Sequence, residues 1–209
     1  MSHVSKAHPA PMEKLFFQLA NTRQMMSLME KDILGAANTF IYDKTDWVKL
    51  WFDPDHAVTS DCGTITAYRA ITIQGQLLWY VFGAGKSRGY HATCADPFAA
   101  MAEAQDVWAR RKYIKTEWAF VETLARDLRL GKRKLEVRIE DAHASPLCTL
   151  GIEGFMASVG LKGVRKISGR IAGLLMKIEP QLGFVIFQAW QREQAQQAHT
   201  SADSAALSA

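Results

Sequence analysis

The stretch TITAYRAITIQGQLLWYVF, from Thr64 to Phe82, decides the fold class of this chain. Its first half, residues 64–73, alternates Ile and Ala with Thr and Tyr, a pattern typical of a half-buried strand. Gln74-Gly75 is typical of a tight turn, and residues 76–82 are almost wholly apolar. The stretch therefore predicts a β-hairpin.

Helical patterns surround this hairpin. Apolar residues recur at helical spacing from Met12 to Ile33, and Gly35 is a suitable end for that helix. Asp96-Pro97 predicts a helix start, because Asp caps a first turn and Pro fits it. The helical pattern then continues, in two segments, as far as Gly131.

The C-terminal half contains one more strand pattern and further helices. Residues 134–140 alternate apolar and charged side chains and predict a third strand. Ser145-Pro146 predicts a helix that Gly160 ends, and another helix is expected from Gly169 to Ile178. Residues 182–190 are apolar on every side, so the pattern fits either a helix or a buried strand.

The order of these elements lacks a regular βαβ alternation. It predicts a single α+β domain in which helices pack on a small antiparallel or mixed sheet of about three strands, at 64–73, 76–82 and 134–140. We expect this domain to cover residues 11–190. Residues 1–10 are interpreted as a flexible leader, and 191–209 as a disordered polar tail.

Composition narrows the class of protein. The 209 residues are 48% hydrophobic and 22% charged, as in globular domains. Three cysteines make no disulfide framework and suit a reducing compartment. No apolar run has the length of a secretory signal or of a membrane-spanning helix. These features predict a cytoplasmic protein that does not bind a membrane.

Positive charge is concentrated in one part of the chain. The formal net charge is +4, but residues 110–176 alone carry +7 and the remainder −3. Between 110 and 138 there are ten Lys and Arg against four Asp and Glu. Clustered cations raise a local positive potential, so this asymmetry indicates a polyanionic partner, although it also fits an ordinary solvated surface.

Residues 154–175 suggest a helix-turn-helix, with a turn at Gly160-Leu161 and Val164, Ile167 and Ile171 on the inner side of the second helix. Together with the basic block, this pattern favours a non-enzymatic protein that binds DNA or RNA, or a protein bound to it. The candidate nucleic-acid-binding residues are Arg110, Arg111, Lys112, Lys132, Arg133, Lys134, Lys162, Arg165, Lys166 and Arg170.

The letters GAGKS at residues 83–87 resemble the end of a phosphate-binding loop. That loop needs a first Gly where this chain has Tyr80, and a helix that begins at the Lys. Here Gly89 and Pro97 follow, so the sequence predicts a glycine-rich exit from the hairpin.

Two His–Cys pairs indicate an alternative function, that of a small thiol-dependent or zinc-dependent enzyme. His91 and Cys94, and His143 and Cys148, form a chemically adequate ligand set for zinc, with Cys62 as a spare ligand. A helix start at Ser145 also places Cys148 in a first turn, where a thiolate is stabilised, with His143 or His91 as base and Asp141 to orient it. A third possibility is a protein–protein adaptor. The favoured interpretation requires no cofactor.

Overall fold

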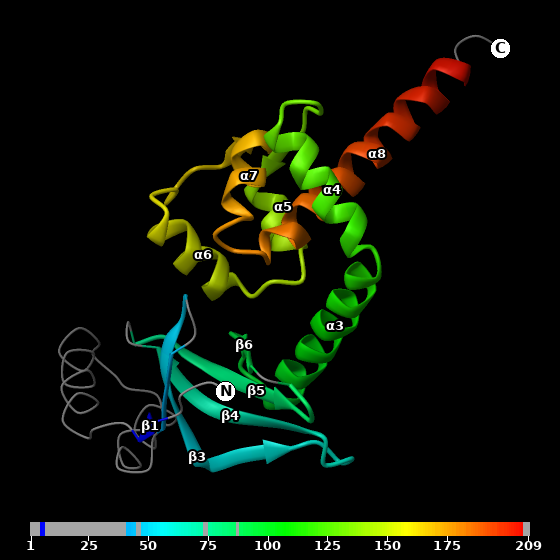
Figure 1. The fold of residues 1–209 in the computed structure, drawn as a ribbon. Helices are drawn as coiled ribbons and strands as arrows, with labels where there is room; N and C mark the ends of the chain where they lie inside the picture. Colours follow the sequence, from blue (N-terminus) through cyan, green and yellow to red (C-terminus); the bar gives the residue numbers. More distant parts are fainter. Residues whose placement is uncertain (1–4, 7–40, 45–46, 73–74, 87, 207–209) are drawn as a thin grey trace, which may run out of the picture. The chain divides into compact units, whose positions relative to one another are not determined.

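The computed structural model describes residues 5–6, 41–44, 47–72, 75–86 and 88–206 (Figure 1). The chain forms two compact units, Met1–Asp106 and Val107–Ala209, here called the N-terminal and C-terminal units. The helix predicted from Met12 to Ile33 lies outside the described residues. Among the described residues, no helix combines the length and the apolar character needed to cross a membrane.

The N-terminal unit contains a six-stranded antiparallel sheet in which the strands follow one another in chain order. The strands are β1 (Ser5–Lys6), β2 (Ile41–Lys44), β3 (Lys49–Thr59), β4 (Ile65–Thr72), β5 (Leu77–Gly83) and β6 (Tyr90–Ala92). The predicted hairpin is β4 and β5, with Ile65 opposite Gly83 and Ile71 opposite Leu77. The prediction of this hairpin from its alternating pattern is therefore confirmed.

Aromatic side chains gather on one face of the sheet. Tyr68 lies opposite Tyr80 in the register of β4 and β5, and Tyr80 opposite His91 in that of β5 and β6. The Tyr80 ring stacks on the His91 imidazole with their centroids 5.1 Å apart, and its centroid lies 4.6 Å from that of the Phe82 ring. Because Tyr80 is completely buried, these contacts form part of the core of the N-terminal unit.

A bulge in β3 carries a buried ion pair. The register of β3 and β4 shifts between Phe52 and Ala57, and Arg69 is the β4 residue that faces this interruption. The Arg69 guanidinium donates to Asp53 Oδ2 at 3.1 Å, and His56 Nδ1 lies 2.6 Å from the same oxygen. The bulge therefore places a carboxylate where the buried Arg69 needs a partner.

Helix α3 (Pro97–Thr116) begins where the sequence predicts a helix start. Asp96 Oδ2 accepts a hydrogen bond from the Ala99 backbone N–H at 2.7 Å, which caps the first turn. The Tyr90 hydroxyl donates to Glu103 Oε1 at 2.6 Å and joins β6 to this helix.

The C-terminal unit is mainly helical. Its helices after α3 are α4 (Trp118–Arg129), α5 (Ile139–Ala144), α6 (Thr149–Ser158), α7 (Gly169–Leu175) and α8 (Leu182–Ala206). The apolar side of α4 contributes Leu124 and Leu128 to a core that also contains Val185 and Ile186 of α8. Gly131 adopts φ +72° just after α4, as expected of a glycine that ends a helix.

A separate two-stranded sheet lies in the C-terminal unit. The third predicted strand is β7 (Glu136–Arg138), which pairs antiparallel with β8 (Lys166–Ser168) and not with the hairpin of the N-terminal unit. Val137 lies opposite Ile167 at the centre of the pair, and the Ile139 and Gly169 N–H groups donate to the Arg165 and Leu135 carbonyls. The α+β class is thus confirmed, with this strand in a second sheet.

Two helices differ from the prediction. The helix expected from Ser145 begins at Thr149, because Ser145 instead ends α5 and Cys148 is the N-cap of α6. Residues 182–190 are helical, and α8 continues to Ala206, where a disordered tail was expected from residue 191. The predicted boundaries of a leader and of one domain over residues 11–190 stay a prediction.

Candidate polyanion-binding surface

Half of the ten predicted nucleic-acid-binding residues make contacts within the C-terminal unit. Arg110 donates to the carbonyl of Ala144, and Arg111 Nε donates to that of Pro146 at 2.7 Å. The other three form ion pairs, namely Arg133 with Glu193 at 3.7 Å, Arg165 with Glu140 at 3.2 Å and Lys166 with Glu136 at 3.2 Å. Their positive charge is therefore partly neutralised or committed to the fold.

The other five predicted cations are exposed. In the part of the chain that the structure describes, no ion pair involves Lys112, Lys132, Lys134, Lys162 or Arg170. They lie on α3, in the turn after α4, in the loop before β8 and on α7. They are thus available to a polyanion but do not by themselves outline a binding site.

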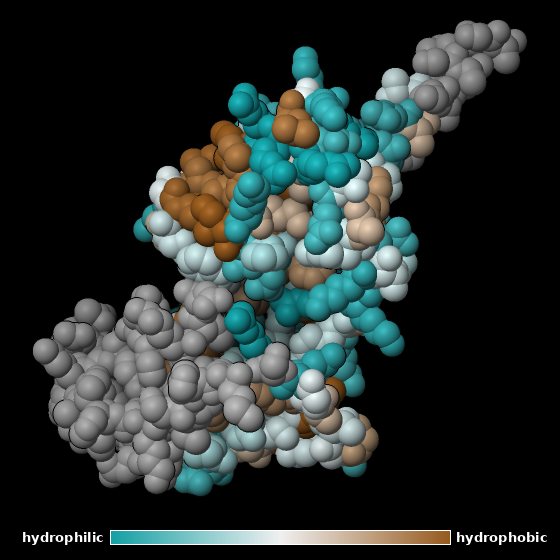
Figure 2. Space-filling view, viewed as in Figure 1, coloured by the Kyte–Doolittle hydropathy of each residue, from teal (hydrophilic) through white to brown (hydrophobic). Residues whose placement is uncertain are grey.

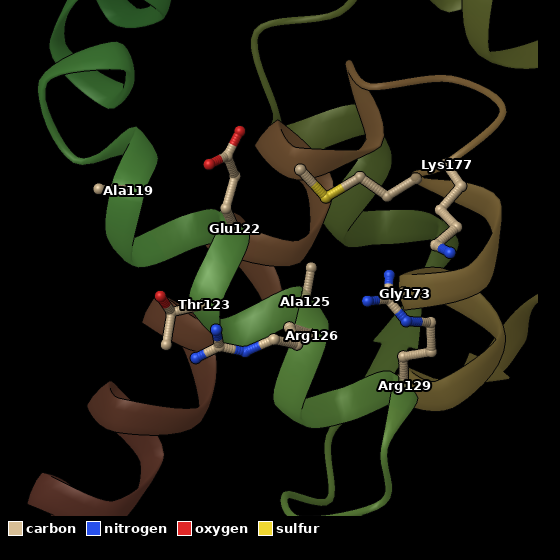
Figure 3. Close-up of a pocket in the computed structure, with 9 residues that line it drawn as sticks. Ala119, Glu122, Thr123, Ala125, Arg126, Arg129, Gly173 and Lys177 are labelled. Carbon is tan, nitrogen blue, oxygen red and sulfur yellow. The ribbon is translucent and has the colours of Figure 1, made fainter.

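A pocket between α4 and α7 gathers cations that the predicted site omits (Figure 3). Its volume is about 510 Å³, and its lining residues are Ala119, Glu122, Thr123, Ala125, Arg126, Arg129, Gly173, Met176 and Lys177. Three of them are cationic and one is acidic. Arg126 Nε lies 3.8 Å from Asp127 Oδ1, while Arg129 and Lys177 form no ion pair with any described residue.

The local structure explains why these side chains line one pocket. Glu122, Arg126 and Arg129 are spaced i, i+4, i+7 and share one side of α4. Figure 3 shows Arg129 extending from α4 and Lys177 from the end of α7 toward the same part of the pocket. Gly173 has no side chain, so it lines the pocket without filling the space between the two helices.

The close approach of α7 to α4 depends on that glycine. A Cβ atom at Gly173 would lie 2.6 Å from the Ala125 carbonyl oxygen, and one at Gly169 would lie 2.8 Å from Leu128 Cδ2. Gly169, Ala172 and Gly173 form the buried side of α7. Small residues therefore fix the distance between the two helices that carry the cations.

The helix-turn-helix interpretation is wrong. Between α6 and α7 the chain forms β8, so Ile167 belongs to a strand and Val164 to the loop before it. Arg165 lies in that loop and Lys166 is the first residue of β8, so neither lies on a recognition helix. The three-residue strand is stabilised by pairing with β7, a contact between segments about 30 residues apart that local sequence patterns do not reveal.

Three of the four residues in the two His–Cys pairs make contacts within the fold. His91 is buried on β6 against Tyr80, and Cys94 Sγ donates to the Asp96 carbonyl at 3.5 Å. Cys148 Sγ accepts from the Gly151 N–H at 3.3 Å, and His143 is exposed on α5. Across the described ranges, no three His, Cys, Asp or Glu side chains form a group that could hold a metal ion.

Asp141 is also committed to the fold and does not orient a base. Its carboxylate accepts from Arg192 Nε at 2.7 Å, from an Arg192 terminal nitrogen at 3.0 Å and from the Arg138 backbone N–H at 2.8 Å. Hydrogen bonding to Asp141 raises the pKa of Arg192. The predicted arrangement of Cys148, His143 and Asp141 as nucleophile, base and orienting acid is therefore not formed.

The described part of the GAGKS segment, residues 83–86, has the predicted non-helical structure. β5 ends at Gly83, Gly85 turns with φ +70°, and β6 follows, so the next helix begins only at Pro97. No helix N-terminus lies at Lys86 to hold a phosphate.

The sequence contained a weak indication of the α4/α7 pocket. Arg126 and Arg129 belong to the basic block and share the polar side of a predicted helix, whereas Lys177 lies one residue beyond that block. Only the packing of α7 on α4 places Lys177 in the same pocket as the two arginines. Comparisons of this chain with protein-family models, with curated proteins and with solved structures found no match.

Proposed function

We propose that this chain is a non-enzymatic, nucleic-acid-associated binding protein whose C-terminal unit contacts the phosphate backbone. The observation that carries the proposal is the α4/α7 pocket, whose lining includes three cations, Arg126, Arg129 and Lys177, and a single carboxylate, Glu122. Guanidinium groups bind phosphate oxygens in pairs of hydrogen bonds, and Lys adds a compact charge. The chemistry of the pocket therefore fits phosphodiesters better than a neutral ligand.

The distribution of charge supports the same proposal. Residues 107–209 contain 16 Lys and Arg against 10 Asp and Glu, a net charge of +6, whereas residues 1–106 carry −2. The exposed Lys132, Lys134, Lys162 and Arg170 extend the cationic surface beyond the pocket. A surface of this kind binds by displacing counterions from the nucleic acid, and its affinity depends on phosphate and not on base sequence.

The test is a fluorescence anisotropy titration with labelled single-stranded DNA, double-stranded DNA and RNA of mixed sequence, between about 50 and 200 mM salt. We expect binding to at least one of them that weakens steeply with salt. The double substitution Arg129→Gln with Lys177→Gln should weaken binding and reduce the slope of log K against log salt by about 2, one for each lost contact.

The control is Lys132→Gln with Lys134→Gln, which removes the same charge from the turn after α4. If this pair had the larger effect, the surface formed by the ten predicted nucleic-acid-binding residues, and not the pocket, would be the contact surface. Absence of binding to all three nucleic acids at the lowest salt would refute the proposed function.

A further inference from the structure

The side of α7 that faces away from α4 is apolar and exposed. Ile171, Leu174 and Ile178 have 44%, 48% and 63% of their surface accessible to solvent. Figure 2 shows strongly hydrophobic side chains gathered over α7 and the loop before β8, and Val164 of that loop is also exposed. A contiguous apolar patch on a globular unit usually marks a contact surface.

These three residues, two on α7 and one in the turn after it, follow the spacing of a coiled-coil seam. Their positions, i, i+3 and i+7, correspond to successive a and d positions of a heptad. Helical winding continues beyond Leu175, because Lys177 N donates to Leu174 O at 3.1 Å and Ile178 N to Leu175 O at 2.9 Å. Ile178 therefore stays on the same side as Ile171.

Cations accompany this seam on one flank. Arg170 and Lys177 immediately precede Ile171 and Ile178, the g positions of the same heptad, where charged residues select a partner helix. Both side chains are exposed, and neither forms an ion pair with a residue in the described part of the chain. No acidic residue occurs between Gly160 and Ile178.

The packing of α7 fixes the direction of the seam. Its opposite side consists of Gly169, Ala172 and Gly173, which are buried against α4 at distances that leave no room for a Cβ atom at either glycine. The helix cannot turn its apolar side inward without losing this contact. The seam is therefore a built surface of the C-terminal unit and not a loosely attached segment.

We propose that this face, defined by Ile171, Leu174, Ile178, Arg170 and Lys177, docks an amphipathic α-helix of a partner protein that carries Asp or Glu beside its own apolar seam. The apolar residues supply the buried contact, and the unpaired cations select an acidic flank. This inference goes beyond nucleic-acid association: the docking face shares Lys177 with the α4/α7 pocket, but its apolar residues lie outside that pocket.

Charge and composition disfavour the other occupants. Antiparallel packing of α7 on a second copy would bring Arg170 of one chain beside Lys177 of the other, so like charges would oppose. The face has no aromatic residue of the kind that anchors helices at a membrane surface, since its exposed apolar side chains are Ile and Leu. A nucleic acid would leave the apolar seam against phosphates.

The experiment uses the full chain and two synthetic helical peptides of about three heptads, identical at their apolar a and d positions, with Glu or with Lys at e and g. Isothermal titration calorimetry should detect binding of the Glu peptide and at least tenfold weaker binding of the Lys peptide. Leu174→Asp should weaken Glu-peptide binding about tenfold. Thermal unfolding followed by circular dichroism shows whether this variant keeps its fold.

Charge exchange gives the sharper readout. Arg170→Glu should weaken binding of the Glu peptide and improve that of the Lys peptide, a reversal that general misfolding cannot produce. Arg170 does not line the α4/α7 pocket and is unchanged in both variants of the nucleic-acid test, so this result is separable from that test. Equal binding of both peptides, binding of phosphatidylserine vesicles without peptide binding, or a dimer in sedimentation velocity that Leu174→Asp dissociates would each overturn the proposal.

Discussion

Cys62 lies in the turn between β3 and β4 and is the exposed member of the three described cysteines. Its Sγ lies 3.4 Å from the Ser60 hydroxyl oxygen and 2.9 Å from that of Thr64. Hydrogen bonds from these two hydroxyls stabilise the thiolate and lower the pKa of Cys62 to about 7. Burial, in contrast, raises the pKa of Cys94.

We predict that iodoacetamide alkylates Cys62 faster than Cys94 at neutral pH. The pH profile of the Cys62 reaction, followed by mass spectrometry, should have its midpoint near 7, because the thiolate is the reacting form. Thr64→Val removes one stabilising hydroxyl and should shift the midpoint upward. Thr66→Val, in the same hairpin, is the control and should leave it unchanged. A wild-type midpoint of about 8.5, that of an ordinary thiol, would contradict the prediction.

The three cysteines also show how far residue-level reasoning from sequence extends. The spacing to His predicts a role for Cys94 and Cys148, yet these thiols form hydrogen bonds with the nearby backbone of Asp96 and Gly151. The same pattern predicts Cys62 only as a spare metal ligand. Its lowered pKa depends on where a turn places two hydroxyls, and residue types alone do not specify that geometry.

At the scale of elements, the contact of α4 with α7 determines the shape of both proposed surfaces. We predict that Gly173→Ala lowers the free energy of unfolding. The higher helix propensity of alanine would by itself stabilise the helix by about 1 kcal/mol relative to glycine. Its Cβ, however, would meet the Ala125 carbonyl at 2.6 Å, and a backbone oxygen cannot rotate away. We expect a net loss of about 1–2 kcal/mol, measured by urea denaturation.

Gly151→Ala is the matched control, because it adds a methyl group to another helix of the same unit. Its nearest neighbour would be Cys148 Sγ at 3.1 Å, the end of a short side chain that can shift. This substitution should be neutral or slightly stabilising. If Gly173→Ala were as well tolerated as Gly151→Ala, the two helices would not be held together as closely as proposed.

Elements with a local pattern were predictable, and elements that depend on distant partners were not. β4, β5, α3 and α4 follow from alternation, helical spacing and capping within each segment. The sequence of β3 favours a turn, because Asp53-Pro54 interrupts the strand pattern. The bulge in β3 is explained only by the pairing of Asp53 with Arg69, which is 16 positions away in the chain. β8 has three residues, too few for a periodic pattern.

For the molecule as a whole, the division into two compact units suggests that stability is also divided. In the C-terminal unit, Asp141 and Arg192 connect α5 to α8 across 51 positions of the chain. Asp141 is buried, whereas the Arg192 side chain is 23% exposed. Arg192 also donates to the Glu136 carbonyl at 2.7 Å, which adds β7 to the same connection.

We predict that Asp141→Ala destabilises the C-terminal unit by about 3 kcal/mol, because it leaves a largely buried guanidinium without its carboxylate. Hydrogen exchange followed by mass spectrometry should then show about 100-fold faster exchange in β7, α5 and the first half of α8. Exchange in β4 and β5 should not change, because their contacts lie in the other unit. Glu193→Ala, which removes the half-exposed pair with Arg133 at 3.7 Å from the neighbouring position, should have little effect in either unit. Faster exchange of β4 and β5 in Asp141→Ala would mean that the two units unfold together.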